Sequence, residues 1–430
     1  MSFRNRTFSR RHGLKMAGAG AAVAGAAAFT SYPIRSRAQN VTLRLSSFAS
    51  TEEQAVIQPQ LDAFREQTGI TVNLETVPTD YPTALTTALA GGTAADVFWV
   101  DSLLAPDLYT RGLLLPMDDV LDVAGGNYFP NLLAGYQYNG QTLGLPKDWS
   151  ALAMWYNTQL FTDAGVEAAP TTWDEFQAAL QTVYDSTGIP GIVVPDPARW
   201  LVFNYQAGGA ILSDDLSEVL IGDEATSTAL EFYYGLYESG IASTPGDLGA
   251  PDQGEAFGNQ LGSATFEGNW NFLNYDTNFP DLPYGVAPLP AGPNGDRATF
   301  AFTVAYSIYA GTQYPNEAAQ LVAFLNNDEI MLNLTTAAGV MPSRSNLTDQ
   351  WLGQFPERQL FVDAAEYARP WSLGPGGQLF YAAASSTLQS LFAGQIDVAA
   401  ATTQLRADAE ANIQLQEPDA AATPVATPAS

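Results

Sequence analysis

Side chains that can hydrogen-bond to hydroxyl groups or stack on sugar rings are grouped in the predicted loops of this chain. Carboxylates and guanidinium groups form directional hydrogen bonds, and an indole or phenyl ring packs on apolar C–H faces. Both kinds together predict non-covalent recognition of a neutral, polyhydroxylated ligand. The candidate ligand-binding residues are Phe48, Glu52, Asp101, Asp148, Trp149, Asp196, Trp200, Trp270, Arg344, Arg369 and Trp371.

Residues 143–157 contain two of these candidates and also predict their local structure. A Gly/Pro pair comes first, then Asp148, Trp149 and Ser150, then an almost wholly apolar run. This order is typical of a loop with polar and aromatic groups that leads into a buried strand. Trp149 fits a sugar-stacking role and core packing equally well, because aromatic side chains mostly fill protein interiors.

The composition excludes most enzyme classes. The chain has no cysteine, and its one histidine is His12, near the N-terminus. Residues 41–430 therefore cannot form a serine–histidine–aspartate triad, a disulfide, or a metal site built on thiolates or imidazoles. The sequence also lacks the P-loop pattern that binds nucleotide phosphates. We expect no cofactor, no metal and no catalysis.

Paired carboxylates are the one enzyme alternative that remains. A glycoside hydrolase needs two carboxyl groups ~5–5.5 Å apart for retention of configuration, or ~6.5–9.5 Å apart for inversion. Asp101 could be paired with Asp148 or with Asp196. The same carboxylates bind hydroxyls without cleaving any bond, so hydrolysis is the alternative hypothesis and binding the preferred one.

The chain is strongly acidic, which bears on its partners. Its 430 residues, 46% of them hydrophobic, predict two or three domains with large cores. Residues 1–38 hold seven basic residues and no acid, which leaves 10 basic against 45 acidic residues and a formal charge of −35. Such a charge repels nucleic acid and anionic lipid headgroups, so we expect neither as a partner. Lys147 is the only lysine after this segment.

Residues 1–38 are predicted to be a signal peptide. Residues 9–15, Ser-Arg-Arg-His-Gly-Leu-Lys, resemble the twin-arginine export motif, with Gly13 where an aromatic residue is usual. The mildly apolar run that follows is shorter than the ~20 residues that span a bilayer. Small residues then precede an expected cut ahead of Gln39. We expect an exported protein, periplasmic or associated with the cell surface. Without a cysteine it cannot be a lipoprotein of the usual kind.

Strands and helices alternate after this segment. Residues 41–47, 70–77 and 96–100 read as strands, and the segments between them carry helical periodicity. This rhythm predicts parallel βαβ units, in which ligands collect beyond the carboxyl ends of the strands. Phe48, Glu52 and Asp101 are expected at that edge, together with Trp99.

Two further segments carry local predictions. Residues 195–200, Pro-Asp-Pro-Ala-Arg-Trp, read as a loop that brings a carboxylate, a guanidinium and an indole together. Residues 416–430 are rich in Ala, Thr and Pro without apolar periodicity, so we predict a disordered tail.

Several motifs, in order, resemble the maltose/trehalose-type extracellular solute-binding proteins of carbohydrate ABC importers. They include Leu-Asp-Ala-Phe at residues 61–64, Thr-Gly-Ile-Thr-Val at 68–72, and residues 90–101, which have Ala95 where the family usually has proline. The crossing segment at 145–157, Pro-Thr-Thr-Trp-Asp-Glu at 170–175 and Ala-Arg-Pro at 368–370 continue the resemblance. It spans roughly residues 41 to 416.

This resemblance implies an α/β fold of the two-lobed periplasmic-binding-protein type, with a mixed central sheet flanked by helices in each lobe and a hinge between lobes. Residues 41–148 and about 302–337 would form lobe 1, and about 149–300 with about 340–415 lobe 2. The resemblance also places an aromatic platform at Trp270 and a ligand-facing guanidinium at Arg369.

The predicted function is therefore the substrate-binding component of an ABC importer. A di- or oligosaccharide would bind between the lobes of a monomer and pass to permease subunits in the membrane. A non-sugar solute, such as a polyamine or a glycerol-phosphate diester, is the alternative within the same fold.

Overall fold

The computed structural model describes residues 41–77, 79–213 and 215–415. The predicted signal peptide and the predicted disordered tail lie outside these residues. Among the described residues, no helix combines the length and the apolar character needed to cross a membrane.

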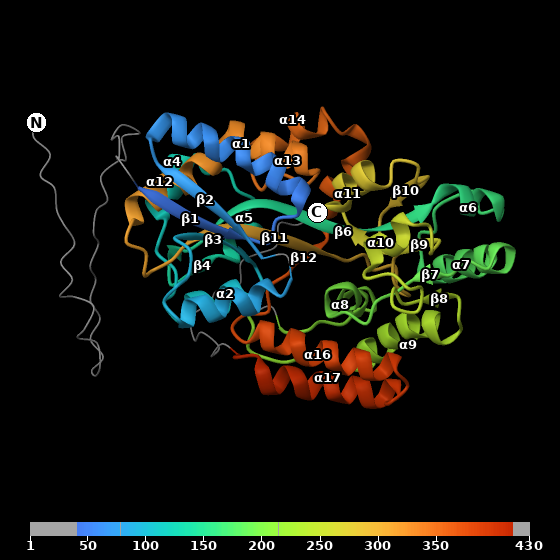
Figure 1. Cartoon of the computed structure of the whole chain (residues 1–430). Helices are drawn as coiled ribbons and strands as arrows, with labels where there is room; N and C mark the ends of the chain where they lie inside the picture. The colour runs from blue at the N-terminus through green and yellow to red at the C-terminus, as the bar shows by residue number, and fades with distance from the viewer. Residues whose placement is uncertain (1–40, 78, 214, 416–430) are drawn as a thin grey trace, which may run out of the picture. The chain divides into compact units, whose positions relative to one another are not determined.

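The N-terminal strands form the parallel unit that the sequence predicts. β1 (Thr42–Ser47) pairs in parallel with both β2 (Thr71–Thr76) and β3 (Val97–Asp101). The connecting helices are α1 (Thr51–Thr68) and α2 (Tyr81–Ala90). Ser50 and Glu53 form a capping box at the start of α1, and Gly69 ends the helix in the left-handed conformation. The carboxyl ends of β1 and β3 consequently lie side by side (Figure 1).

A thirteen-residue strand, β6 (Leu145–Asn157), joins two parts of one sheet. Its first half pairs antiparallel with β11 (Thr299–Ile308), and its second half pairs antiparallel with β9 (Ala264–Gly268) and β10 (Tyr284–Ala287). The eight-stranded sheet has the order β10-β6-β11-β3-β1-β2, with β9 added on β6 and β12 (Ala368–Pro370) on β11. The buried strand predicted within residues 143–157 is confirmed, but the loop predicted before it is wrong, because Asp148, Trp149 and Ser150 already belong to β6.

Helices cover both parts of the sheet. Near β1 and β2 lie α12 (Pro315–Leu325) and α13 (Asp328–Ala338), which contact α1. At the other end, five helices surround a large hydrophobic core (Figure 1). They are α7 (Trp173–Thr187), α8 (Pro197–Gln206), α9 (Glu224–Glu238), α16 (Gly377–Phe392) and α17 (Val398–Asn412). The remaining helices and strands are α3 (Ala105–Tyr109), α4 (Asp118–Ala124), α5 (Pro130–Ala134), β4 (Gln137–Tyr138), β5 (Gln141–Thr142), α6 (Thr158–Asp163), β7 (Gly191–Ile192), β8 (Ala242–Ser243), α10 (Gln253–Gly258), α11 (Asn271–Asn278), α14 (Thr348–Leu352) and α15 (Gln359–Asp363).

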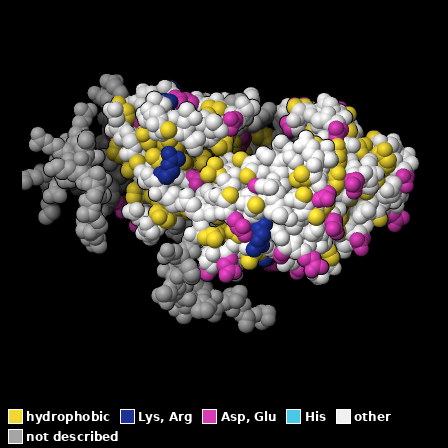
Figure 2. Space-filling model, turned by 90° about the horizontal axis from the view of Figure 1, so that it is seen from below, with side chains coloured by type: hydrophobic (Ala, Val, Ile, Leu, Met, Phe, Trp, Pro, Cys, Tyr) yellow, Lys and Arg dark blue, Asp and Glu magenta, His cyan; other side chains and the backbone are white. Residues whose placement is uncertain are grey.

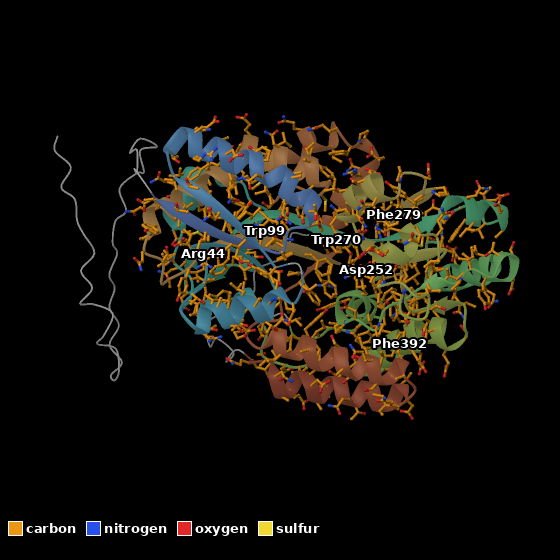
Figure 3. All side chains as sticks on the ribbon, viewed as in Figure 1. Arg44, Trp99, Asp252, Trp270, Phe279 and Phe392 are labelled. Atoms are coloured by element: carbon orange, nitrogen blue, oxygen red, sulfur yellow. The ribbon has the colours of Figure 1, made fainter. Side chains whose placement is uncertain are left out.

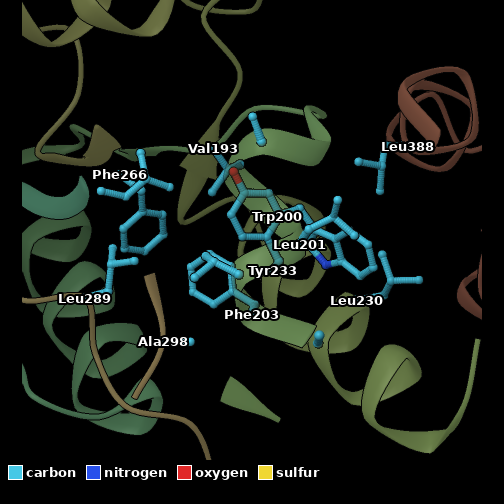
Figure 4. Packing of buried hydrophobic residues seen from close by; sticks show 14 of the residues in the cluster. Val193, Trp200, Leu201, Phe203, Leu230, Tyr233, Phe266, Leu289, Ala298 and Leu388 are labelled. Atoms are coloured by element: carbon cyan, nitrogen blue, oxygen red, sulfur yellow. The ribbon is translucent and has the colours of Figure 1, made fainter. Parts of the chain in front are cut away.

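The expected loop at residues 195–200 is largely wrong, because α8 begins at Pro197. Asp196 is the N-cap residue and accepts a hydrogen bond from the backbone N–H of Ala198 at 2.7 Å. Proline at the first helical position favours this start, since its fixed φ suits a helix and it lacks the N–H that would be unpaired. Trp200 consequently lies on the helix and belongs to the same core cluster as Phe203 and Tyr233 (Figure 4).

The surface reflects the acidic composition. Figure 2 shows acidic side chains spread over the visible face and basic ones at few points. Most of the described arginines form ion pairs with carboxylates, as in the pair between Arg44 and Glu75 at 2.5 Å. An exposed pair of this kind contributes about 0–1 kcal/mol, so the acidic surface favours solubility more than stability.

Trp155→Ala tests the packing around β6. The indole is fully buried, contacts the rings of Phe272, Tyr275 and Tyr284, and donates a hydrogen bond to the carbonyl of Glu267 at 2.9 Å. We expect the free energy of unfolding to fall by about 3–5 kcal/mol, because the truncation leaves a cavity. Urea unfolding measures it. Tyr184→Ala, at a side chain 37% exposed, is the control and should change stability by less than about 0.5 kcal/mol. Equal effects of the two variants would contradict this packing.

Candidate ligand-binding cleft

A cleft of about 540 Å³ lies where the two parts of the sheet meet. Its walls come from the carboxyl ends of β1 and β3, the start of α1, β6, β11, α8 and α11. The lining residues are Phe48, Ser50, Glu53, Trp99, Asp101, Lys147, Asp148, Ser150, Arg199, Trp270, Asn271, Leu273, Asn274, Phe302, Thr303, Val304, Ala338, Val340 and Trp371. Figure 3 labels Trp99 and Trp270, one from each part of the molecule.

Aromatic rings line both sides of the cleft. On one side, Phe48 meets Trp99 edge-on with ring centroids 5.2 Å apart. On the other, Trp270 meets Phe302 edge-on at 5.6 Å, and Trp371 lies 5.3 Å from Phe302. Edge-to-face packing fixes these rings. Phe48, Trp270 and Phe302 remain partly exposed and can meet C–H groups of a ligand, whereas Trp99 and Trp371 are only 1% and 5% exposed.

A β-bulge in β6 brings two consecutive side chains into the cleft. Asp148 lies opposite Val304 on β11, and Pro146 lies opposite Ala305, so Lys147 is an extra residue without a partner opposite it. Regular pleating would place neighbouring side chains on opposite faces. The bulge breaks this alternation, and both Lys147 and Asp148 line the cleft. Trp149 then points to the other face.

The charges at this bulge neutralise one another. The Lys147 ammonium forms an ion pair with the Asp148 carboxylate, and the two side chains are only 12% and 10% exposed. The ammonium also lies 4.0 Å from the centroid of the Trp99 ring, in a cation–π contact.

A second ion pair lies on the α8 side. Arg199 Nη2 is 2.5 Å from Glu267 Oε1, and Gln253 Nε2 donates to the same oxygen at 2.7 Å. Burial raises the pKa of Glu267, while the Arg199 charge and the Gln253 hydrogen bond act in the opposite direction. Arg199 also borders an adjoining cavity of about 610 Å³, which shares Trp270, Asn271 and Asn274 with the cleft.

Asp101 has a structural task at the end of β3. Its Oδ1 accepts hydrogen bonds from the backbone N–H groups of Leu103 and Leu104 at 2.9 and 2.8 Å. Burial raises the pKa of this carboxyl, and the two backbone donors oppose that shift. The carboxylate lines the cleft but already has these two donors.

Five of the residues predicted from the sequence are brought together in the cleft. They are Phe48, Asp101, Asp148, Trp270 and Trp371. A sixth, Asp196, lines the adjoining cavity, where it caps α8 and accepts a hydrogen bond from the Tyr381 hydroxyl at 3.1 Å. Glu52 lies in the first turn of α1, but the structure does not describe its side chain. The neighbouring Glu53 lines the cleft.

The other four predicted residues do not line the cleft. Trp149 is 3% exposed and packs against Phe129, and Trp200 is fully buried in the core. Arg344 is buried too, where it is bound to Asp328 and to the carbonyl of Ala124. Arg369 is on the surface, 5.3 Å from the Tyr205 ring. We do not retain these four as ligand contacts.

Sequence reasoning missed Lys147, Arg199 and Phe302 as cleft residues. Lys147 stands out in the composition as the only lysine after the predicted signal peptide. The direction of its side chain, however, depends on the bulge, which the sequence does not reveal. The direction of Arg199 depends on where α8 begins. Phe302 lies in an apolar strand whose two faces have no distinguishing pattern, so nothing in the sequence points to it.

Arg199→Met tests the buried ion pair. The substitution leaves the Glu267 carboxylate, 3% exposed, without its cation. We expect the free energy of unfolding to fall by about 3–5 kcal/mol in a urea titration. The double variant Arg199→Met, Glu267→Gln removes the unpaired charge and should recover much of the loss. A double variant less stable than Arg199→Met would contradict this account.

Comparison with known proteins places these features in a family. Residues 60–357 match the model described as bacterial extracellular solute-binding protein. A binding protein of Brucella abortus (strain 2308) is 27% identical over 359 residues, which cover 80% of this chain and 86% of that protein. A diacetylchitobiose binding protein of Streptomyces coelicolor is 24% identical over 280 residues, covering 63% and 65% of the two chains.

The fold also matches a solved structure. The GacH receptor of Streptomyces glaucescens, determined without ligand and with acarbose, aligns with a TM-score of 0.79 at 22% identity, covering 85% of this chain and 96% of the receptor. The expected α/β, two-lobed fold is confirmed, and so is the family resemblance read from the sequence motifs. This chain belongs to the bacterial extracellular solute-binding proteins, the solute-binding components of ABC importers.

Proposed function

We propose that this protein captures a neutral glycoside, a di- or oligosaccharide, in the cleft and delivers it to the permease of an ABC importer. The observation that carries the proposal is the lining itself. Aromatic rings stand on both sides of the cleft, and both cations of its lining, Lys147 and Arg199, are ion-paired within the protein. A ligand with apolar C–H faces and uncharged hydroxyls matches such a lining.

The charges argue against the two non-sugar solutes. A glycerol-phosphate diester needs cations for its phosphate, and both cations of the cleft, Lys147 and Arg199, already hold carboxylates. A polyamine needs carboxylates, and those of the cleft already have partners within the protein. Asp148 is ion-paired, Asp101 accepts two backbone N–H groups, and Glu53 accepts the backbone N–H of Ser50. Hydroxyl groups can add hydrogen bonds to these pairs without separating the charges.

Hydrolysis is disfavoured by the same contacts. A retaining or inverting glycosidase needs one carboxyl group free to give a proton and another free to act as nucleophile or base. Asp148 pairs with a cation, and Asp196 accepts the N–H of Ala198 and the hydroxyl of Tyr381. These contacts support binding without catalysis, in keeping with a family of binding proteins.

The strand pairing supports the proposed lobe boundaries. Lobe 1 would comprise residues 41–148 and about 302–337, and lobe 2 about 149–300 and about 340–415. β6 changes partners from β11 to β9 between Ala151 and Leu152. A backbone bridge between Trp149 and Met341 lies beside the crossing. These crossings would form the hinge, and a ligand that contacts both lobes would shift the population toward a closed form.

The export route is proposed from the sequence. The twin-arginine-like motif at residues 9–15 supports export of the folded chain, and the absence of cysteine argues against a lipid anchor. We propose a monomer that is free in a periplasm or held at the cell surface through its permease.

A thermal-shift screen tests the proposal with maltose, trehalose, maltotriose, xylose oligomers, glycerophosphodiesters and spermidine. A ligand at about 100 times its dissociation constant stabilises the native state by about 2.7 kcal/mol. We expect a glycoside to raise the melting temperature, and Trp270→Ala to abolish that rise because the stacking ring is lost.

Trp149→Phe is the matched control, since it alters a buried aromatic residue outside the cleft. It should melt at a lower temperature but keep the ligand-induced shift. Stabilisation by spermidine alone, or a glycoside shift that survives in Trp270→Ala, would contradict the proposal.

A further inference from the structure

One wall of the cleft has the features of a binding site for organic cations. Phe48, Tyr81 and Trp99 form an aromatic group, with the Phe48 centroid 5.2 Å from each of the other two. The Asp148 carboxylate lines the same cleft as Phe48 and Trp99. Aromatic faces beside a carboxylate are the usual means by which proteins bind ammonium groups. A strongly acidic protein would further attract such solutes.

The protein's own lysine occupies this position. The Lys147 ammonium lies 4.0 Å from the Trp99 centroid and is ion-paired with Asp148, so it makes both contacts that an ammonium ligand would make. The side chain is 12% exposed. A buried lysine would be costly without these contacts, because its charge loses water.

The bulge shows that this placement depends on a specific backbone feature. In a regular strand Lys147 would point away from the face that carries Asp148 and Ser150. The extra residue opposite the Val304–Ala305 step turns its side chain to the cleft. Bulges commonly re-aim a side chain beside a functional site.

We propose that Lys147 is a specificity-determining residue, an internal cation that fills the Trp99–Asp148 site and thereby excludes cationic solutes from the cleft. This inference rests on the proposed function, because it explains how an acidic, aromatic-lined cleft selects neutral ligands. A competing ammonium ligand would have to displace the tethered one, while a hydroxyl group leaves the ion pair intact. The occupied site would thus create specificity by weakening the binding of cationic solutes, not by strengthening the binding of the neutral ligand.

Lys147→Ala tests the inference by opening the site. The probes are choline, spermidine and 3,3-dimethylbutanol, which is the uncharged carbon analogue of choline. We expect choline and spermidine to bind the variant about tenfold more tightly than they bind the unmodified protein, measured by thermal shift and isothermal titration calorimetry. The uncharged analogue should show no such gain. Lys147→Arg keeps the cation and should behave like the unmodified protein.

Near-UV circular dichroism and a cooperative melt establish that the variants are folded. If Lys147→Ala does not fold, Lys147→Gln takes its place, since it keeps most of the stem and removes the charge. The inference is overturned if a folded neutral variant gains no affinity for choline, or gains as much for the uncharged analogue. It is also overturned if the unmodified protein binds choline as tightly as the variant. These readings do not require a glycoside to bind, so they are independent of the screen above.

Discussion

The continuity of β6 through both parts of the sheet is the constraint on which the cleft depends. Its first half pairs with β11 and its second half with β9 and β10, so one strand sets the position of both walls. The cleft opens beside the point where these partners change. The Thr303 hydroxyl on β11 donates a hydrogen bond to the carbonyl of Asp148 at 2.7 Å, which holds β6 and β11 together beside this point. A ligand that touches both walls therefore contacts groups positioned by a shared backbone.

Charge pairing follows from the shape of this cleft. Side chains between two walls lose much of their water, and an unpaired buried charge is far more costly than a paired one. Lys147 with Asp148, and Arg199 with Glu267, meet that requirement within the protein. The result is a lining of aromatic side chains and ion-paired cations inside a chain of formal charge −28. Surface charge and cleft chemistry are thus separate properties here.

Local periodicity predicted much of the fold. It could not predict the side-chain directions that depend on pairing between segments far apart in the sequence. β1, α2 and the apolar second half of β6 follow from apolar spacing and turn residues, and the parallel pairing of β1 with β2 and β3 follows from the alternation of strands and helices. The direction of Lys147 depends on its register against β11, about 150 residues later in the sequence, so no local pattern reveals it. Arg344 looked like a ligand contact because nothing in the sequence shows that its guanidinium binds Asp328, 16 residues earlier, and the Ala124 carbonyl, 220 residues earlier.

A crystal structure of the protein with the glycoside that stabilises it most would test the central claim directly. The account predicts a sugar ring on Trp270, with contacts that reach the Phe48 and Trp99 side of the cleft, and with the Lys147–Asp148 pair intact. A sugar bound elsewhere on the surface, or one that contacts a single wall and leaves the opposite aromatic groups exposed, would contradict it.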